Sequence, residues 1–139
     1  MPLPDLFDLT GKTALVTGAG QGLGAEMAGA LADAGAQVAL VDRDASGLAE
    51  TAAALDGTEV FSLLADVTDP QAMEDAVSQT VARFGALDIV IPNAGISEAQ
   101  PGLLHEMPRE DWERVTSVNL DGVYNTIRPA LGQMMAQGG

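Results

Sequence analysis

The sequence of 139 residues contains no cysteine and few basic residues. Without cysteine the chain can form no disulfide, no thiolate metal site and no thiol nucleophile, which fits a reducing compartment. Six Lys and Arg stand against twenty Asp and Glu, and the formal charge of −14 argues against nucleic acids and anionic membranes, because both are bound through basic patches. No apolar run approaches the ~20 residues of a membrane span, and residues 1–10 lack the basic segment of a secretory signal. We therefore expect a cytoplasmic protein that binds neither nucleic acid nor a membrane.

Strand and helix patterns alternate regularly along the chain. A hydrophobic content of 47% and a mean hydropathy of +0.15 predict one globular domain at residues 1–139, with residues 1–10 as an N-terminal arm. Apolar runs predict strands at residues 12–17, 37–41, 60–65 and 87–91, each followed by a helical pattern. This alternation predicts an α/β fold, a doubly wound Rossmann-type parallel sheet with helices on both faces.

The turn Thr17-Gly-Ala-Gly-Gln-Gly-Leu-Gly24 joins the first predicted strand to the first helix. Gly18 can adopt backbone angles closed to other residues, and Gly22 lets main chain approach a ligand closely. Gly24 lets the helix lie tightly on the strand. Because the first N–H groups of a helix have no partner within it, they favour an anion at that end. The turn therefore predicts a cradle for a pyrophosphate.

Polar residues also follow the other three predicted strands, namely Asp42, Asp66 and Asn93. Ligands of such sheets bind outside the carboxyl ends of the strands, so these residues and the glycine turn predict one site. The Asp42 carboxylate can accept both hydroxyls of a ribose and would repel a 2′-phosphate. Arg43 is the alternative, since its side chain could pair with that phosphate. We favour Asp42 and expect NAD(H) to be preferred to NADP(H).

These residues resemble the short-chain dehydrogenase/reductase family in the branch with the motif T-G-x-x-x-G-x-G. Asp66-Val67 is similar to the pair that contacts adenine in the family, and Asn93-Ala94-Gly95 to the end of its Asn-Asn-Ala-Gly motif. Val118-Asn119-Leu120 resembles the segment that holds the family's catalytic Asn. The resemblance implies NAD as cofactor and a strand order of 3-2-1-4. Together, the motifs and the resemblance predict cofactor contacts at Gly18, Gln21, Gly22, Leu23, Gly24, Asp42, Arg43, Asp66, Val67, Asn93, Ala94 and Gly95.

The catalytic residues that the resemblance implies have no counterpart here, apart from Asn119 as a remnant. The family uses Ser, Tyr and Lys, but the only lysine is Lys12 and the only tyrosine is Tyr124, which we expect to pack rather than to catalyse. The chain therefore resembles a truncated, cofactor-binding half of such an oxidoreductase, inactive alone. Pro92 also departs from the family, because it replaces an Asn and removes a donor at the end of the fourth strand.

Helical spacing predicts the buried faces of the helices. Two helices are expected to begin at the caps Asp44 and Asp69, the second with a buried stripe at Met73, Ala76, Val77, Thr80, Val81 and Phe84. The predicted buried face of the first helix comprises Leu23, Met27, Ala30, Leu31 and Ala34. The last helix is expected from about Pro108 to Gln137, kinked or ended early by Pro129, with a core face at Trp112, Val115, Thr116, Asn119 and Val123.

Other functions remain open at this point. A second chain could complete the active site in trans, or the chain could be a non-catalytic assembly fragment with a vestigial pocket. A methyltransferase also uses a glycine turn, although Thr17 and the Asn93 motif argue against one. His105 is expected to be solvated, and the carboxylates show no metal-ligand spacing, so we expect no metal. The edge of strand 87–91 or the C-terminal helix favours a homo-oligomer.

Overall fold

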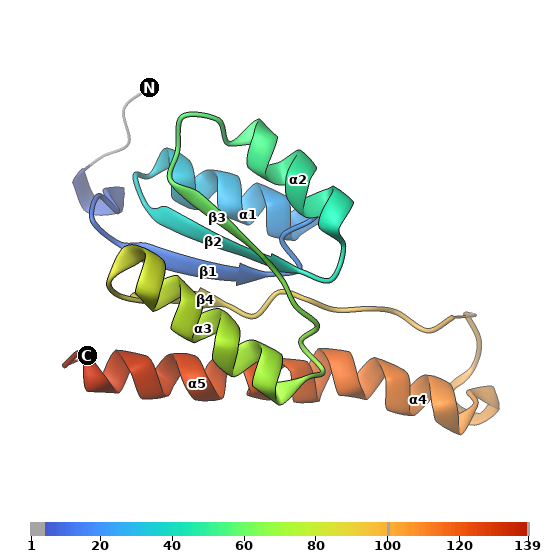
Figure 1. Cartoon of the computed structure of the whole chain (residues 1–139). Helices are drawn as coiled ribbons and strands as arrows, with labels where there is room; N and C mark the ends of the chain where they lie inside the picture. The colour runs from blue at the N-terminus through green and yellow to red at the C-terminus, as the bar shows by residue number, and fades with distance from the viewer. Residues whose placement is uncertain (1–4, 100, 139) are drawn as a thin grey trace.

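A computed structural model describes residues 5–99 and 101–138, and the start of the predicted N-terminal arm lies outside the described residues. The strands are β1 (Thr13–Thr17), β2 (Gln37–Asp42), β3 (Val60–Leu64) and β4 (Ile89–Ile91). They form one parallel sheet in the order β3-β2-β1-β4 (Figure 1). The predicted fold class and strand order are therefore confirmed.

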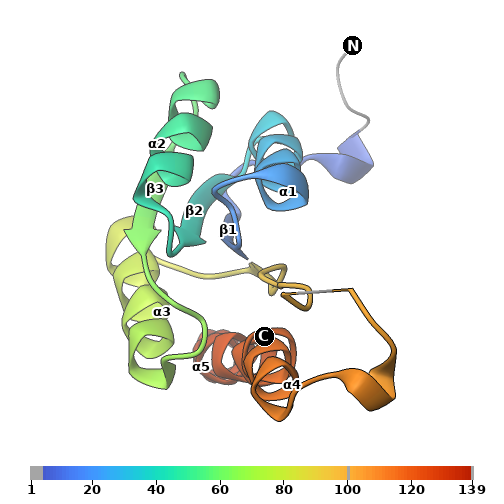
Figure 2. The same cartoon turned by 90° about the vertical axis from the view of Figure 1, so that its right-hand side faces the viewer.

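Helices cover both faces of this sheet. The helices α1 (Gly22–Asp33) and α2 (Ala45–Ala54) lie on one face, and α3 (Pro70–Phe84) and α5 (Gly122–Ala136) on the other (Figure 2). Successive side chains of β1 point alternately toward the two helical layers, because side chains alternate between the two faces of a strand. Leu15 belongs to the core beneath α3 and α5, whereas Val16 belongs to the core beneath α1 and α2, and both are fully buried.

The second and third helices begin where the sequence predicts. The Asp44 side chain accepts the N–H of Ser46 and caps α2, and the Asp69 side chain accepts two N–H groups of the first turn of α3. Gly85 ends α3 with φ of 91°, a left-handed conformation that favours glycine. Along α3 the expected stripe is buried or half-buried, with Met73 and Thr80 fully so. Both caps and this stripe are confirmed.

The predicted buried face of α1 is wrong by about one position. Gly24, Ala28 and Ala32 face the sheet, whereas Leu23, in the first turn of the helix, is 72% exposed. The cause is the close approach of the helix to the glycine turn, which only small residues allow. A Cβ at Gly24 would stand 1.9 Å from the carbonyl oxygen of Gly18. Small residues therefore mark this interface better than large ones.

The last helical region has three parts: α4 (Arg109–Thr116), a π-helical segment η3 (Ser117–Asp121), and α5. Pro129 lies within α5 and does not end it early, and its neighbours Thr126 and Ala130 are fully buried against the rest of the fold. A core face at Trp112 is wrong: α4 has no buried residue, and Trp112 is 48% exposed. The reason is visible in Figure 1, where α4 extends beyond the carboxyl ends of the strands.

Candidate cofactor-binding site

A cavity of 370 Å³ opens at the carboxyl ends of the strands. It takes its lining from the glycine turn and from the segments that follow β2, β3 and β4, with one residue of η3. The lining residues are Gly18, Gln21, Leu23, Gly24, Val41, Asp42, Arg43, Ala65, Asp66, Val67, Asn93, Ala94, Gly95, Ile96 and Val118. Every residue predicted to contact the cofactor is among them except Gly22. Five segments far apart in the sequence therefore meet at one place.

The glycine turn adopts conformations and contacts that require glycine. Gly18 and Gly22 have φ of 65° and 54°, in the left-handed region. A Cβ at Gly18 would stand 2.9 Å from both the Asn93 amide nitrogen and Cα of Ala94. The turn consequently leads into α1 without side chains in the way, and the free N–H groups of the first turn of α1 can receive an anion there.

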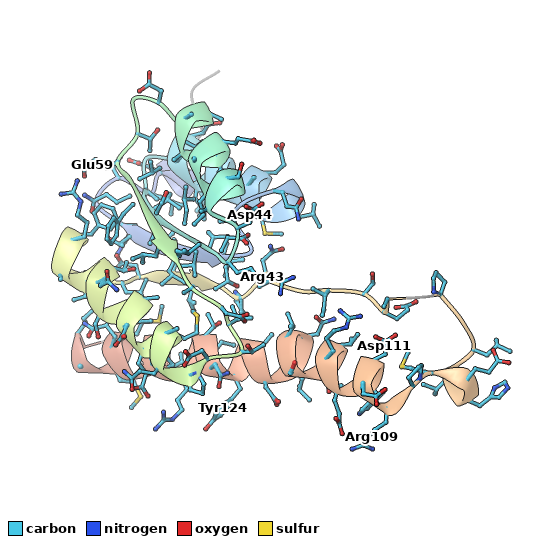
Figure 3. The ribbon with its side chains drawn as sticks, turned by 45° about the vertical axis from the view of Figure 1, so that its right-hand side comes forward. Arg43, Asp44, Glu59, Arg109, Asp111 and Tyr124 are labelled. Carbon is cyan, nitrogen blue, oxygen red and sulfur yellow. The ribbon has the colours of Figure 1, made fainter. Side chains whose placement is uncertain are left out.

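Asp42, at the end of β2, is bound to the glycine turn by its own side chain. Its Oδ2 accepts the N–H of Gly20 at 2.9 Å, and its Oδ1 accepts the N–H of Asp44 at 3.0 Å. A carboxylate has four lone-pair sites, so two remain for further donors such as hydroxyls. Arg43 follows it and also lines the cavity, at the carboxyl end of β2 with Asp44 (Figure 3). Asp42 thus both holds the turn and offers charge to a ligand.

Asp66 is the second carboxylate of the cavity. Its Oδ1 accepts the backbone N–H of Thr68 at 2.9 Å and the Thr68 hydroxyl at 2.8 Å. The backbone hydrogen bond lowers the pKa of Asp66 most, and the hydroxyl bond and the charge of Arg43 lower it further, while burial opposes them. The carboxyl group is therefore ionised at neutral pH, with one side chain oxygen not used by Thr68.

The segment after β4 is clamped onto β1. The Asn93 side chain donates to the carbonyl oxygens of Thr17 and Gly18 at 3.1 and 3.4 Å, and the N–H of Ala94 donates to the hydroxyl of Thr17 at 3.1 Å. These hydrogen bonds join the segment after β4 to the end of β1. None of them uses an N–H at position 92, so the proline there does not prevent them. The Asn93 amide thus supports the floor of the cavity rather than standing free for a ligand.

Asn119 lies in η3 and is not among the lining residues. Its side chain oxygen accepts the N–H of Ile96, and its amide donates to the carbonyl of Ile96, both at 2.8 Å. It therefore fixes the main chain of a residue that does line the cavity. π-Helical segments inside helices occur frequently at functional sites, which fits this placement.

The cavity also has apolar walls, at Val41, Ala65, Ile96 and Val118, which the sequence motifs did not predict. Val41 and Ala65 each precede a predicted polar residue, so their position beside a strand end was an available signal. Val118 stands next to Asn119, and only the fold brings it to the cavity. Polar motifs alone could not reveal these walls.

The other chemically active side chains lie elsewhere. Tyr124 is 65% exposed on α5 and points away from the sheet (Figure 3), so the expectation that it packs is wrong. Lys12 pairs with Asp88 at 3.4 Å, at the opposite end of the strands. His105 is exposed beside Glu106. Over residues 5–99 and 101–138, no group of three His, Asp or Glu side chains is placed to hold a metal ion.

The fold and the cavity at its strand ends define a Rossmann-type α/β protein. Among known protein families, residues 12–139 match the family model described as short chain dehydrogenase. The chain belongs to the short-chain dehydrogenase/reductase family.

Relatives and solved structures agree with this family. The chain is 38% identical to gluconate 5-dehydrogenase of Gluconobacter oxydans and 36% identical to D-threitol dehydrogenase of Mycolicibacterium smegmatis, covering 99% and 96% of this chain and 54% and 51% of those proteins. A short-chain type dehydrogenase/reductase from Mycobacterium marinum superimposes with a TM-score of 0.91 at 38% identity, over 96% of this chain and 53% of that one. The chain spans about half the length of these relatives.

One further solved structure carries a nicotinamide cofactor. The 3-ketoacyl-(acyl-carrier-protein) reductase from Brucella melitensis complexed with NADH has a TM-score of 0.88 at 35% identity, over 94% of this chain and 53% of that one.

In the described part of our chain, no helix combines the length and the apolar content needed to cross a membrane.

Proposed function

We propose that this chain binds a nicotinamide dinucleotide, NAD(H) in preference to NADP(H), as the cofactor-binding part of an oxidoreductase. The observation that carries the proposal is the cavity of 370 Å³ shared by the glycine turn and the ends of all four strands. The free N–H groups at the start of α1 suit the pyrophosphate. When bound, the cofactor would accept or donate a hydride, with an alcohol or a carbonyl compound as the other partner.

The preference for NAD(H) is supported by the position of Asp42. Its carboxylate is held at the rim of the cavity by Gly20 and Asp44, so it cannot easily turn away from a ribose. A 2′-phosphate would meet this fixed negative charge, and in a partly enclosed cavity the repulsion is only weakly screened. Arg43 is the opposing group, but it is exposed and free to extend into water.

Calorimetric titrations with NAD, NADP and S-adenosylmethionine test this proposal. We expect NAD to bind more tightly than NADP and S-adenosylmethionine not to bind. Equal affinities for the two dinucleotides would contradict the preference, and binding of S-adenosylmethionine alone would favour a methyltransferase. No binding of either dinucleotide would leave the chain as an assembly fragment with a vestigial pocket.

We further propose that these 139 residues alone do not turn over an alcohol or a carbonyl compound. Proton transfer by a positioned acid or base is worth ~10² to 10⁴ in rate, and the residues that line the cavity include no tyrosine, histidine or lysine. Asn119 is occupied with Ile96, and Tyr124 faces away from the cavity. A spectrophotometric assay across secondary alcohols tests this, and turnover that disappears in Tyr124→Phe would contradict it. Turnover that appears only on adding a separate C-terminal piece of a relative would favour completion of the site in trans.

Self-association belongs to the same proposal. Among the described residues β4 pairs only with β1, and α5 and η3 expose Leu120, Tyr124, Leu131 and Met135. An open edge and an apolar face both favour association, most simply as a two-fold dimer. Light scattering tests it. A monomer at all concentrations contradicts self-association. Dissociation of a dimer by Met135→Lys assigns the interface to the helix, and a dimer that persists in this variant favours the edge of β4.

A cytoplasmic location stays a prediction from the sequence.

A further inference from the structure

Gly47 lies in the first turn of α2, outside the cavity, and is packed against the main chain of the glycine turn. It is buried, and a Cβ at this position would stand 2.5 Å from the carbonyl oxygen of Gly20 and 3.0 Å from its carbonyl carbon. Both of these atoms belong to the main chain of Gly20, which is buried, so they cannot move aside as the end of a flexible side chain would. The present arrangement of α2 and the turn therefore requires glycine at this position.

The residue that Gly47 touches is the middle of the glycine turn. The N–H of Gly20 donates to Asp42 at 2.9 Å, and the N–H of Ala19 donates to the carbonyl of Val41 at 3.1 Å. Ala19 and Gly20 are both buried. The turn is thus held from two sides, by the end of β2 through hydrogen bonds and by the first turn of α2 through close packing.

The contact with Gly47 reaches the start of α1 through a single peptide group. The carbonyl of Gly20 shares its peptide plane with the N–H of Gln21, and Gln21 is the residue that precedes α1. Gln21 has no side-chain hydrogen bond that caps the helix. The directions of the first N–H groups of α1 consequently depend on where the main chain of Gly20 lies.

We propose that Gly47 is a positioning residue for the cofactor, an inference that rests on the proposed binding of a nicotinamide dinucleotide. By letting α2 lie against Gly20, it sets the main chain from which α1 presents its N–H groups to the pyrophosphate. A side chain at position 47 pushes the carbonyl of Gly20 and turns the next peptide with it. Because misdirected N–H groups lose part of their hydrogen bonds to the charged pyrophosphate, we expect NAD binding to weaken roughly tenfold to 100-fold.

The test compares Gly47→Ala with Gly29→Ala and Gly132→Ala in the full chain. All three replace a helical glycine and gain similar helix propensity. A Cβ at Gly29 meets only the Leu55 side chain at an ordinary 3.7 Å, and one at Gly132 meets nothing within 4 Å. Calorimetry measures NAD affinity, thermal unfolding shows that each variant is folded, and NMR without cofactor follows the amides of residues 20–22.

We expect Gly47→Ala alone to lose affinity and to shift the amides of residues 20–22, whereas a role in folding alone would change only the thermal midpoint. A folded Gly47→Ala variant with unchanged affinity overturns the inference, whether or not these amides shift. If Gly47→Ala does not fold, Asp44→Ala takes its place, because it removes the cap that fixes the first turn of α2, and the same shifts and loss are then required. An unaltered chain that does not bind NAD contradicts the proposed function instead, and the amide shifts alone then decide whether Gly47 positions the turn.

Discussion

Two regions of the molecule are packed differently. One is the cavity side, which comprises β1, β2, the glycine turn and α1, and the other is the helical rod of α4, η3 and α5. Every residue of β1 is buried, as are residues 38–41 of β2, and α1 reaches them with Gly24, Ala28 and Ala32. In contrast, α4 buries no residue, and the rod exposes Trp112 and several other large apolar side chains. The main chain around the cavity is therefore fixed by close packing, whereas the rod exposes apolar surface.

Hydrogen bonds from side chains to main chain hold both regions, since Asn119 of the rod binds Ile96, and the rod adds exposed ion pairs. At the cavity, side chains bind main chain: Asp42 accepts from Gly20, and Asn93 donates to Thr17. The rod is attached partly through exposed side chains, such as the ion pair of Arg128 with Glu74 at 3.0 Å. Main-chain anchors restrict a site more than exposed ion pairs do, because an exposed pair gains little over solvation by water.

The largest expected difference between the two regions is in stability. Leu15→Ala removes a fully buried side chain from β1 and should lower the free energy of unfolding by about 2–5 kcal/mol. Leu131→Ala removes a side chain that is 50% exposed on α5, and surface changes of this kind stay within about 0.5 kcal/mol. Urea denaturation of both variants measures the contrast. Equal losses would show that the rod is held by apolar packing as strongly as the sheet.

The sequence predicted the cavity side well because its signals are local. The parallel α/β fold followed from alternating patterns, the strand order from the resemblance to the family, and the cavity from polar residues at strand ends, since parallel strands bring their carboxyl ends to one edge. The caps Asp44 and Asp69 each act within their own turn. Such features depend on residues within a few positions of one another.

The remaining errors concern contacts between distant segments. The buried face of α1 is made of its smallest residues, because α1 approaches Gly18 too closely for larger ones. Trp112 and Tyr124 have the size of core residues, but no element of the described chain covers them. Pro129 stays within α5 because burial on both sides of it holds the helix together. Hydrophobic size alone could not reveal which surfaces meet.

Asp42 anchors the glycine turn and also brings a negative charge to the cavity, and variants can separate these two roles. Asp42→Ala should weaken NAD binding by about 1–3 kcal/mol, because hydrogen bonds to a charged group are lost. Asp42→Asn is the matched control, since its amide oxygen can still accept the N–H of Gly20 at the same place. Calorimetry with NAD and NADP then separates charge from anchoring. We expect both variants to lose preference for NAD, and only Asp42→Ala to weaken NADP as well.

A smaller effect is expected for the attachment of the rod. Arg128→Ala should lower the free energy of unfolding by only about 0–1 kcal/mol, because the pair with Glu74 is largely exposed. The loss should disappear at high salt, which screens exposed charges. Arg109→Ala is the control, since its partner Glu113 lies within α4 itself. If Arg128→Ala costs several kcal/mol while Arg109→Ala does not, ion pairing rather than apolar packing joins α5 to α3.

The smallest expected effect is at Asp66, on the cavity side. Its pKa lies below the ordinary value of 3.8, mainly through the backbone bond from Thr68. Because the folded pKa is the lower one, the stabilisation is full above pH 3.8 and is lost as the pH falls through the folded pKa. Thr68→Val removes the hydroxyl bond and keeps the backbone bond, so NMR titration should show a partial rise in the pKa of Asp66. At Asp8 the hydroxyl of Thr10 is instead the largest cause of a lowered pKa, and Thr10→Val should raise that pKa more. A full return of Asp66 to 3.8 in Thr68→Val would show that the main chain does not hold this carboxylate.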